Sequence, residues 1–329
     1  MKKLKIIFAA VLAVLLLACL HYFMPGHDVL FDIHDGATGG QIARDLKEQH
    51  IISSRLWFKA LLRLTGGRKH LRPGRYRLRT GMSGEEVVWT LFHTDGRYYV
   101  KFAVPEGWRA EQIADKLNAS GVSSGAEFLA IARAEKLEGR LFPSTYFFEE
   151  KIPARQVANI MLKEFDRQVR PLLTDAATAN LSAPNILVIA SIVEREAVVH
   201  EERPLIAAVY LNRIKRNILL EADPTVQYAI GYVPADKSWW KRRTTLADLK
   251  VESPYNTYRY PGIPPGPICN PGLESIKAVL NPARVDSIYF VSDRQGRHIF
   301  NEDYKEHLKA KRQMKEEARR RKAAAMSGN

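Results

Sequence analysis

The sequence Ala190-Ser191-Ile192-Val193-Glu194-Arg195-Glu196 places two carboxylates at the end of an apolar run that begins at Ile186. Ser182 is suited to cap a helix here, and Pro184 is tolerated in a first helical turn because its missing N–H would have no partner there. These signals predict a helix over residues 183 to about 200. We expect the domain that contains it to be built around this helix.

On a helical wheel the apolar side chains form one stripe that faces the core, and Arg195 lies on the opposite side. Glu194 and Glu196 lie about 80° to either side of the stripe. A carboxyl beside apolar surface has a raised pKa and can hold a proton near neutrality, as a general acid must. The alternative is that both are solvated surface acids. The wheel does not decide which of them faces a cleft, because they are nearly mirror images about the stripe.

The length of 329 residues allows two or three domains, and 46% hydrophobic residues suffice for packed cores. Fifty Lys and Arg against 36 Asp and Glu give a net charge of +14, which suits nucleic acid, an anionic membrane or an acidic polymer. The tail over residues 305–329 holds nine Lys or Arg and three Glu, hence six of these charges. We expect the tail to be a frayed, solvated helix whose deletion leaves membrane retention and activity unchanged; binding to anionic lipid is the alternative.

A membrane anchor is expected at the start of the chain. Lysines precede the apolar stretch over residues 4–24, which at ~1.5 Å per residue reaches the ~30 Å of a hydrocarbon core. The basic flank should stay in the cytoplasm, so the rest of the chain should lie outside it. A cleaved signal peptide and a lipoprotein signal ending at Cys19 are the alternatives. A chain anchored in this way would not meet DNA, so no nucleic-acid partner is expected.

The cysteine and histidine patterns predict neither a disulfide framework nor a metal site. Cys19 lies inside the expected anchor and Cys269 lies far downstream, so the two are not expected to pair. The nine histidines are scattered without the spacing of metal ligands. We therefore expect no metal and no cofactor.

A weak repeat occurs three times between residues 28 and 124. Each copy has a glycine, then Gln or Glu followed by two apolar residues, then Leu. The copies are Gly36 with Gln41-Ile42-Ala43 and Leu46, Gly81 with Glu86-Val87-Val88 and Leu91, and Gly107 with Gln112-Ile113-Ala114 and Leu117. The pattern predicts strand, tight turn and short amphipathic helix. Such units resemble the LysM-like module that binds glycan chains; a spacer domain is the alternative.

Further helices are predicted over residues 127–136, 155–169, 203–213 and 273–280, and strands over 287–292 and 298–300. Between the last two helices, residues 253–272 repeat Pro and Gly, which prevent regular structure, while Tyr, Asn and Thr offer uncharged hydrogen-bonding groups. A rigid polar loop of this kind is typical of a binding site. Asp223, which precedes Pro224, is suited either to cap a helix or to shape the site.

Taken in chain order, these motifs resemble the YceG-like family of endolytic murein transglycosylases. The resemblance spans about residues 102–301 and rests on Leu137-Glu138-Gly139, Glu194-Arg195-Glu196, Asn212-Arg213, Asp223-Pro224-Thr225-Val226, Pro264-Pro265-Gly266-Pro267-Ile268 and Asn270-Pro271-Gly272, together with residues 253–258. It implies that the second carboxylate, Glu196, is the catalytic acid, with Glu194 in a supporting or structural role. Ser144 stands where the family more often has Asp, and Arg195 replaces a usual Lys, a change expected to be neutral on an outward face.

The resemblance implies lytic cleavage of peptidoglycan between N-acetylmuramic acid and N-acetylglucosamine. Protonated Glu196 would donate to the leaving oxygen and then accept the proton of the sugar's C6 hydroxyl, leaving a 1,6-anhydro end. The residues expected to bind substrate are Tyr255, Asn256, Thr257, Tyr258, Asp223, Thr225 and Gln227. The reaction would terminate elongation of nascent strands, with peptidoglycan synthases as family-implied partners. A glycan-binding scaffold without activity and a hydrolytic muramidase are the alternatives.

The expected architecture is α+β, with a single N-terminal transmembrane helix, a small LysM-like αβ module and a mixed catalytic domain. The expected boundaries are 1–25 for the anchor, 26–100 for the LysM-like module, 101–304 for the transglycosylase domain and 305–329 for a basic helical or disordered tail. The expected location is the cytoplasmic (inner) membrane, with the catalytic domain on its outer side.

Overall fold

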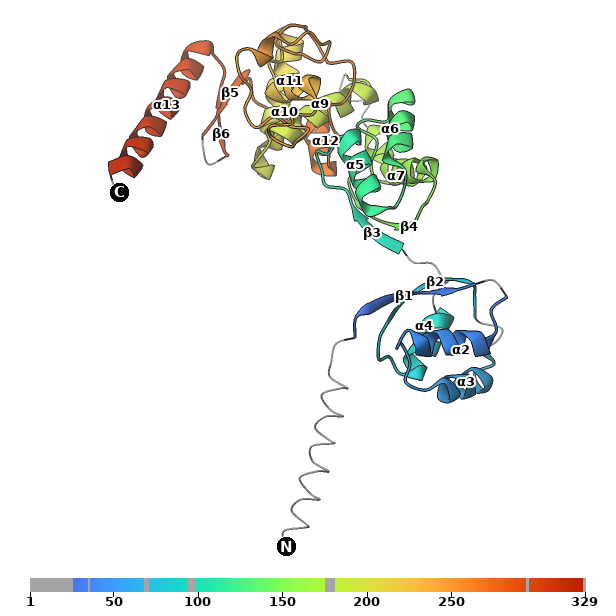
Figure 1. Cartoon of the computed structure of the whole chain (residues 1–329). Helices are drawn as coiled ribbons and strands as arrows, with labels where there is room; N and C mark the ends of the chain where they lie inside the picture. The colour runs from blue at the N-terminus through green and yellow to red at the C-terminus, as the bar shows by residue number, and fades with distance from the viewer. Residues whose placement is uncertain are drawn as a thin grey trace. The chain divides into compact units, whose positions relative to one another are not determined.

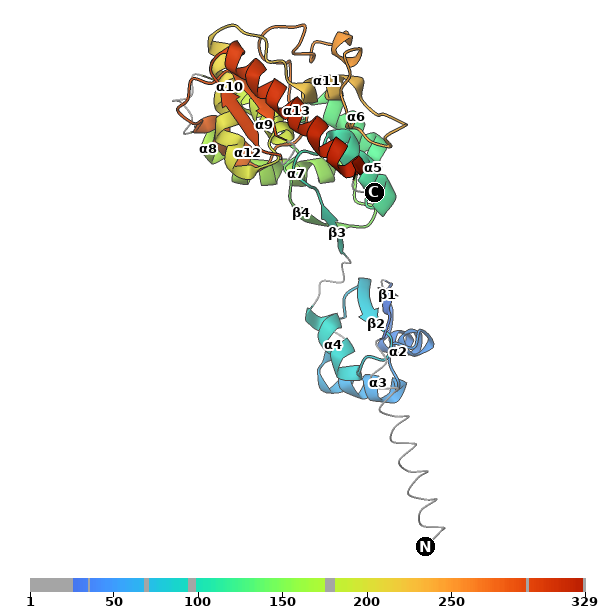
Figure 2. The same ribbon diagram turned by 90° about the vertical axis from the view of Figure 1, so that its left-hand side faces the viewer.

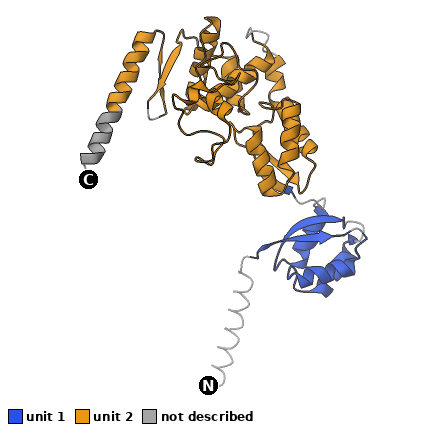
Figure 3. Ribbon diagram, turned by 45° about the horizontal axis from the view of Figure 1, so that its top comes forward, with its two compact units in different colours: residues 1–99 blue, residues 100–329 orange. Residues whose placement is uncertain are grey.

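A computed structural model describes residues 26–34, 36–67, 71–93, 99–174, 181–293 and 296–327 (Figure 1). The chain forms two compact units, one up to Tyr99 and one from Val100 onward (Figure 3). Within the described ranges, no helix has both the length and the apolar character needed to cross a membrane. The anchor expected over residues 4–24 lies outside these ranges.

The first unit has the element order β1, α2, α3, β2, α4. Strand β1 (Asp28–Ile33) pairs antiparallel with β2 (Gly74–Arg79). The helices are α2 (Gly39–Glu48), α3 (Arg55–Leu64) and α4 (Gly84–His93). The largest buried side chains include Phe31, Ile42, Leu46, Ile51, Phe58, Leu78 and Leu91. This unit therefore has a hydrophobic core of its own.

The three copies of the repeat are three helix entries, as predicted. Gly36, Gly81 and Gly107 all have left-handed backbones, with φ of 76°, 76° and 74°. Five residues after each glycine, the side chain of Gln or Glu accepts a hydrogen bond from the backbone N–H of the residue before the helix. These bonds are Thr38 to Gln41 (2.8 Å), Ser83 to Glu86 (2.9 Å) and Arg109 to Gln112 (3.2 Å). The third copy opens α5 (Ala110–Ser120) of the second unit, so the repeat is a capping device used in both units.

The second unit begins with a layer of helices beside a small sheet. Strand β3 (Tyr99–Ala103) pairs with β4 (Thr145–Glu149). The helices are α5 (Ala110–Ser120), α6 (Gly125–Ala134) and α7 (Ala154–Gln168). Their shared core includes Phe102, Ile113, Leu117, Phe128, Phe148 and Met161.

A second hydrophobic core in this unit surrounds α9 (Ala183–Glu196). Helices α10 (Arg203–Lys215), α11 (Asp223–Ile230) and α12 (Leu273–Leu280) pack against it (Figures 1 and 2). The short α8 (Arg170–Thr174) precedes it, and 3-10 turns occupy His200–Glu202 and Asp248–Lys250. As predicted, residues 253–272 form neither helix nor strand, apart from one isolated bridge between Asn270 and Trp108.

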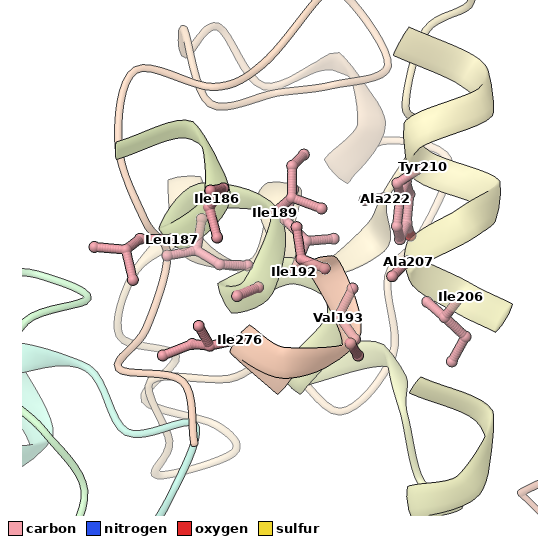
Figure 4. Close-up of a cluster of buried hydrophobic side chains, with 14 of the residues drawn as sticks. Ile186, Leu187, Ile189, Ile192, Val193, Ile206, Ala207, Tyr210, Ala222 and Ile276 are labelled. Carbon is pink, nitrogen blue, oxygen red and sulfur yellow. The ribbon is translucent and has the colours of Figure 1, made fainter. Parts of the chain in front are cut away.

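Helix α9 begins as predicted, with the Ser182 side chain accepting from the N–H of Asn185. It ends at Glu196 and not near residue 200, because Ala197 is extended (φ −75°, ψ 107°). Every residue from 186 to 193 is buried, so a single core-facing stripe was the wrong description. Figure 4 shows side chains of α9 pointing toward both α10 and Ile276 of α12. A helix that is apolar on all sides is a central helix of its domain.

The chain ends with a hairpin and a long helix. Strand β5 (Tyr289–Ser292) pairs antiparallel with β6 (His298–Asn301), and α13 (Tyr304–Ser327) packs against both strands. His307 and Ala310 in its first turns are only 6% and 5% exposed. The expectation of a frayed, solvated tail was therefore wrong for these turns, because their apolar and aromatic side chains cover the hairpin.

Candidate active site

An open cleft of about 450 Å³ surrounds the carboxyl of Glu196 at the last turn of α9. Its walls come from α10, the start of α11, the β5–β6 hairpin and α13. The polar residues that line it are Glu196, Tyr210, Arg213, Glu221, Asp223, Tyr258, Tyr289, Ser292, His298, Tyr304, His307 and Lys311. Side chains that lie as far apart in sequence as Glu196 and Lys311 therefore line one cleft, next to the Glu196 carboxyl.

The surroundings of Glu196 favour its protonated form. Its pKa is raised to about 7, chiefly by burial and to a lesser extent by the neighbouring carboxylate of Asp223. The Tyr210 hydroxyl donates to Glu196 Oε1 at 2.9 Å, and this hydrogen bond and the charge of Arg195 act in the opposite direction. At neutral pH a substantial fraction of Glu196 thus holds a proton and can act as a general acid.

Asp223 and Tyr258 are the predicted substrate residues that the structure brings to this cleft. Asp223 is the first residue of α11 and does not cap it, since the preceding Ala222 holds the cap position. The Tyr258 hydroxyl donates to Asp223 Oδ1 at 2.7 Å. Burial and this carboxylate raise the pKa of Tyr258, so it remains a neutral phenol. Together the two side chains offer an acceptor and an aromatic ring beside Glu196.

Three other predicted residues are buried and use their hydrogen bonds inside the protein. The hydroxyls of Thr225 and Thr257 lie 2.9 Å apart, and Thr257 Oγ1 also accepts from the N–H of Ala222. Asn256 Nδ2 donates to the carbonyls of Leu249 (2.9 Å) and Val251 (2.8 Å). None of the three lines the cleft among the residues described. They hold the start of α11 against the loop and so position Asp223.

Tyr255 and Gln227 lie elsewhere. Tyr255 lines a second cavity of about 300 Å³, where its ring centroid is 4.8 Å from that of Tyr228. Buried Glu138 also lines this cavity, and burial raises its pKa to about 8. Gln227 Nε2 is 3.5 Å from Thr244 Oγ1. The structure therefore does not bring these two predicted substrate residues together with Glu196.

Glu194 has a different environment from Glu196, which the helical wheel could not show. Its side chain is 7% exposed and accepts from the N–H of Gly272 (3.0 Å) and the hydroxyl of Ser275 (2.7 Å) at the N-terminus of α12. Arg203 Nη2 of α10 lies 3.4 Å away. A carboxylate at a helix N-terminus is stabilising. Glu194 thus ties three helices together.

Arg195 does not lie on an outward face, so that expectation was wrong. Its guanidinium carbon lies 4.0 Å from the ring centroid of Trp240, and burial lowers its pKa. Arg109 is stacked 4.1 Å from the ring of Tyr228 and 5.6 Å from that of Trp240. These cation–π contacts hold the segment between α11 and the polar loop against the body of the unit.

The sequence did not identify Tyr210 or the C-terminal wall of the cleft. Tyr210 lies in the helix predicted over residues 203–213, and no role was predicted for it, although a buried tyrosine hydroxyl needs a partner. His298 lines the cleft, and its Nδ1 lies 2.7 Å from Glu202 Oε2. His307 and Lys311 lie in the segment 305–329, whose composition indicated only a solvated tail, and Tyr304 directly precedes that segment.

A cleft with one proton-holding carboxyl, a partner phenol and a nearby carboxylate defines an enzyme of the general acid–base class. The chain belongs to the YceG-like family, whose pattern matches residues 31–313. This confirms the resemblance drawn from the motifs.

Relatives and a solved structure agree with this assignment. An endolytic murein transglycosylase of Bacillus subtilis strain 168 is 30% identical over 309 residues, which are 86% of this chain and 84% of the relative. One from Streptococcus pneumoniae strain D39 is 27% identical over 316 residues, 85% of this chain and 57% of the longer relative. The crystal structure of a YceG-like protein of Listeria monocytogenes superposes with a TM-score of 0.57 at 28% identity, covering 86% of this chain and 98% of that one.

Proposed function

We propose that this protein is an endolytic lytic transglycosylase of peptidoglycan, with Glu196 as its acid and base. The observation that carries the proposal is the raised pKa of Glu196, about 7, in an open cleft of about 450 Å³. Family membership and the names of the relatives support the substrate and the reaction type. The bond cleaved joins N-acetylmuramic acid to N-acetylglucosamine.

The reaction can proceed with one carboxyl. Glu196 donates its proton to the glycosidic oxygen as the bond from C1 of the muramic acid breaks. The resulting carboxylate accepts the proton of the C6 hydroxyl, whose oxygen forms a bond to C1, so that a 1,6-anhydro ring closes and Glu196 is again protonated. Tyr210 holds the carboxyl in place through its 2.9 Å hydrogen bond. Acid–base catalysis of this kind contributes about 10²–10⁴-fold.

Asp223 and Tyr258 support the developing positive charge at C1. A carboxylate beside an oxocarbenium-like state stabilises it, and Tyr258 fixes the orientation of that carboxylate. The same carboxylate favours a second candidate, a hydrolytic muramidase in which Asp223 would activate water. The two candidates differ in their products, because only hydrolysis leaves a reducing end.

A comparison of two isosteric variants tests the role of Glu196. Glu196→Gln cannot transfer a proton and should lose about 10²-fold or more of the rate of strand cleavage. Glu194→Gln should keep its activity wherever the protein remains folded, since Glu194 bonds to α12 and α10. Near-normal activity of Glu196→Gln, with loss in folded Glu194→Gln, would reverse the assignment.

We place the protein at the cytoplasmic membrane, with both units on its outer side. This location rests on the apolar stretch over residues 4–24 and its basic flank.

The first unit serves as a LysM-like glycan-binding module, supported by its separate core and its two helix-entry repeats. Sedimentation of residues 26–99 with insoluble peptidoglycan would test this role, and a unit that stays in the supernatant would indicate a spacer.

A further inference from the structure

The first unit exposes a group of large apolar side chains on α3 and α4. Leu56 and Leu64 of α3 are each 80% exposed, and Trp57 is 50% exposed. Trp89 of α4 is 63% exposed. Single exposed apolar residues are ordinary, but neighbouring ones mark an interaction surface. We call these four residues the α3–α4 surface.

Contacts between the two helices make this surface continuous. The indole N–H of Trp57 donates to Glu85 Oε1 of α4 at 2.8 Å. Trp89 lies four residues after Glu85, one turn along the same face of α4. A Cβ added to Gly84 would lie 3.1 Å from the Trp57 ring, so the helices meet closely there.

Basic residues border the surface along one side of α3. At 100° per residue, Arg55, Lys59 and Arg63 occupy one contiguous sector, and the next sector holds Leu56 and Leu64. All three basic side chains are exposed, and among the described residues none forms an ion pair. Phe58 and Leu62 face the core of the unit on the other side.

We infer that the α3–α4 surface docks on an anionic lipid bilayer. A helix with aliphatic and indole side chains beside a basic sector is typical of a segment that lies in the membrane interface. Exposed leucines offer a sugar chain no hydrogen-bonding group, whereas acyl chains match the leucines and anionic headgroups match the three cations, so lipid fits better than glycan. Tryptophan is enriched at the membrane interface because its ring is apolar and its indole N–H is polar.

The length of chain before this unit supports lipid as the occupant. The proposed anchor over residues 4–24 is followed almost directly by β1, which begins at Asp28. Three connecting residues span at most about 11 Å. This inference rests on the proposed anchor, which would keep the first unit at the bilayer surface.

The test places a nitroxide label in the middle of the surface of the full-length protein in lipid nanodiscs. Ala60→Cys provides the site, in a background of Cys19→Ala and Cys269→Ala, and Glu48→Cys on α2 is the control position. In nanodiscs with anionic phosphatidylglycerol, the label at residue 60 should be shielded from a water-soluble nickel relaxant. The control label should stay accessible.

Variants of the surface make the result specific. Lys59→Gln should lower the ratio of docked to undocked protein about fivefold, the factor that corresponds to ~1 kcal/mol per basic residue near anionic lipid. Arg44→Gln, an equal charge change on exposed α2, should leave the ratio unchanged. The double change of Leu56→Ser and Leu64→Ser should abolish shielding.

Two outcomes would overturn the inference. A label at residue 60 that stays accessible to the nickel relaxant in anionic nanodiscs means that the surface does not dock on lipid. Shielding that requires added peptidoglycan oligosaccharides, and not anionic lipid, would make it a glycan surface. The leucine variants should cleave soluble glycan strands at the parent rate, so failure here is distinct from failure of the proposed activity.

Discussion

At the residue scale, two glutamates two positions apart have different roles because different segments of the unit supply their hydrogen-bond partners. Glu194 accepts three donors from α10 and α12, whereas Glu196 accepts one, from Tyr210. The sequence could place both at the end of an apolar run. It could not separate them, since the partners that do so lie 9 to 81 residues further along.

The pH dependence of strand cleavage should follow the neighbours of Glu196. The acid form is the active one, so activity should fall as pH rises through about 7. Tyr210→Phe removes a hydrogen bond that lowers the pKa and should move this fall to higher pH. Asp223→Asn removes a charge that raises the pKa and should move it to lower pH. Rate profiles measured from pH 5 to 9 that shift together, or not at all, would contradict this account.

The pH dependence of folding stability should reflect the same raised pKa of Glu196. The pKa of Glu196 is about 7 in the folded protein against 4.5 for an unperturbed glutamate, so folding stability is lost as pH rises from 4.5 to 7. This cost reaches up to about 3 kcal/mol above pH 7. Glu196→Gln should therefore raise the melting temperature at pH 8 and change it little at pH 4. An equal effect at both pH values would show that packing, and not ionisation, is responsible.

Glu194→Gln should weaken the fold. It removes a charge from the N-terminus of α12 and leaves Arg203, 4% exposed, with a weaker partner. We expect a loss of about 3 kcal/mol in the free energy of unfolding, measured by denaturant titration. Glu274→Gln, also at the start of α12 but with its side chain 65% exposed, is the matched control and should change little.

At the element scale, the start of the central helix α9 could be predicted from the sequence, whereas the part of the cleft formed by α13 could not. The cap, the proline and the apolar run of α9 are local signals, and its start was predicted correctly. Its burial on all sides depends on helices distant in sequence, so the single stripe was wrong. The first turns of α13 are charged like a solvated tail, yet Tyr304 and His307 cover the hairpin and line the cleft.

Truncations separate the two parts of α13. Deletion of residues 304–329 uncovers β5 and β6 and removes one wall of the cleft, and should reduce strand cleavage at least about tenfold. Deletion of residues 318–329 alone should leave the rate unchanged. Equal rates for both truncated proteins would show that α13 has no part in the site.

At the scale of the whole molecule, the chain forms two units with separate hydrophobic cores. Composition and the repeat indicated an α+β chain of several parts. The mutual positions of Glu196, Asp223 and Tyr258 arise only from long-range packing, so Tyr255, Asn256 and Gln227 could not be told from true cleft residues by polarity alone. Resemblance to a family singled out Glu196, and the geometry gives a physical reason for that choice.

The second unit should therefore carry the chemistry alone. A protein of residues 99–329 should cleave short soluble strands with the pH profile of the longer chain, because every residue that lines the cleft belongs to this unit. Loss of cleavage by this protein while its circular dichroism and melting transition are retained would show that the first unit takes part in the reaction.

The central claim is that one carboxyl, Glu196, cleaves the strand without water. The most direct measurement is digestion of intact glycan strands by residues 26–329 in water enriched in oxygen-18, with the products weighed by mass spectrometry. The account predicts 1,6-anhydro ends that carry no heavy oxygen and that are absent with Glu196→Gln. Reducing ends labelled with oxygen-18 would contradict it and make the protein a hydrolase, with Asp223 as the base.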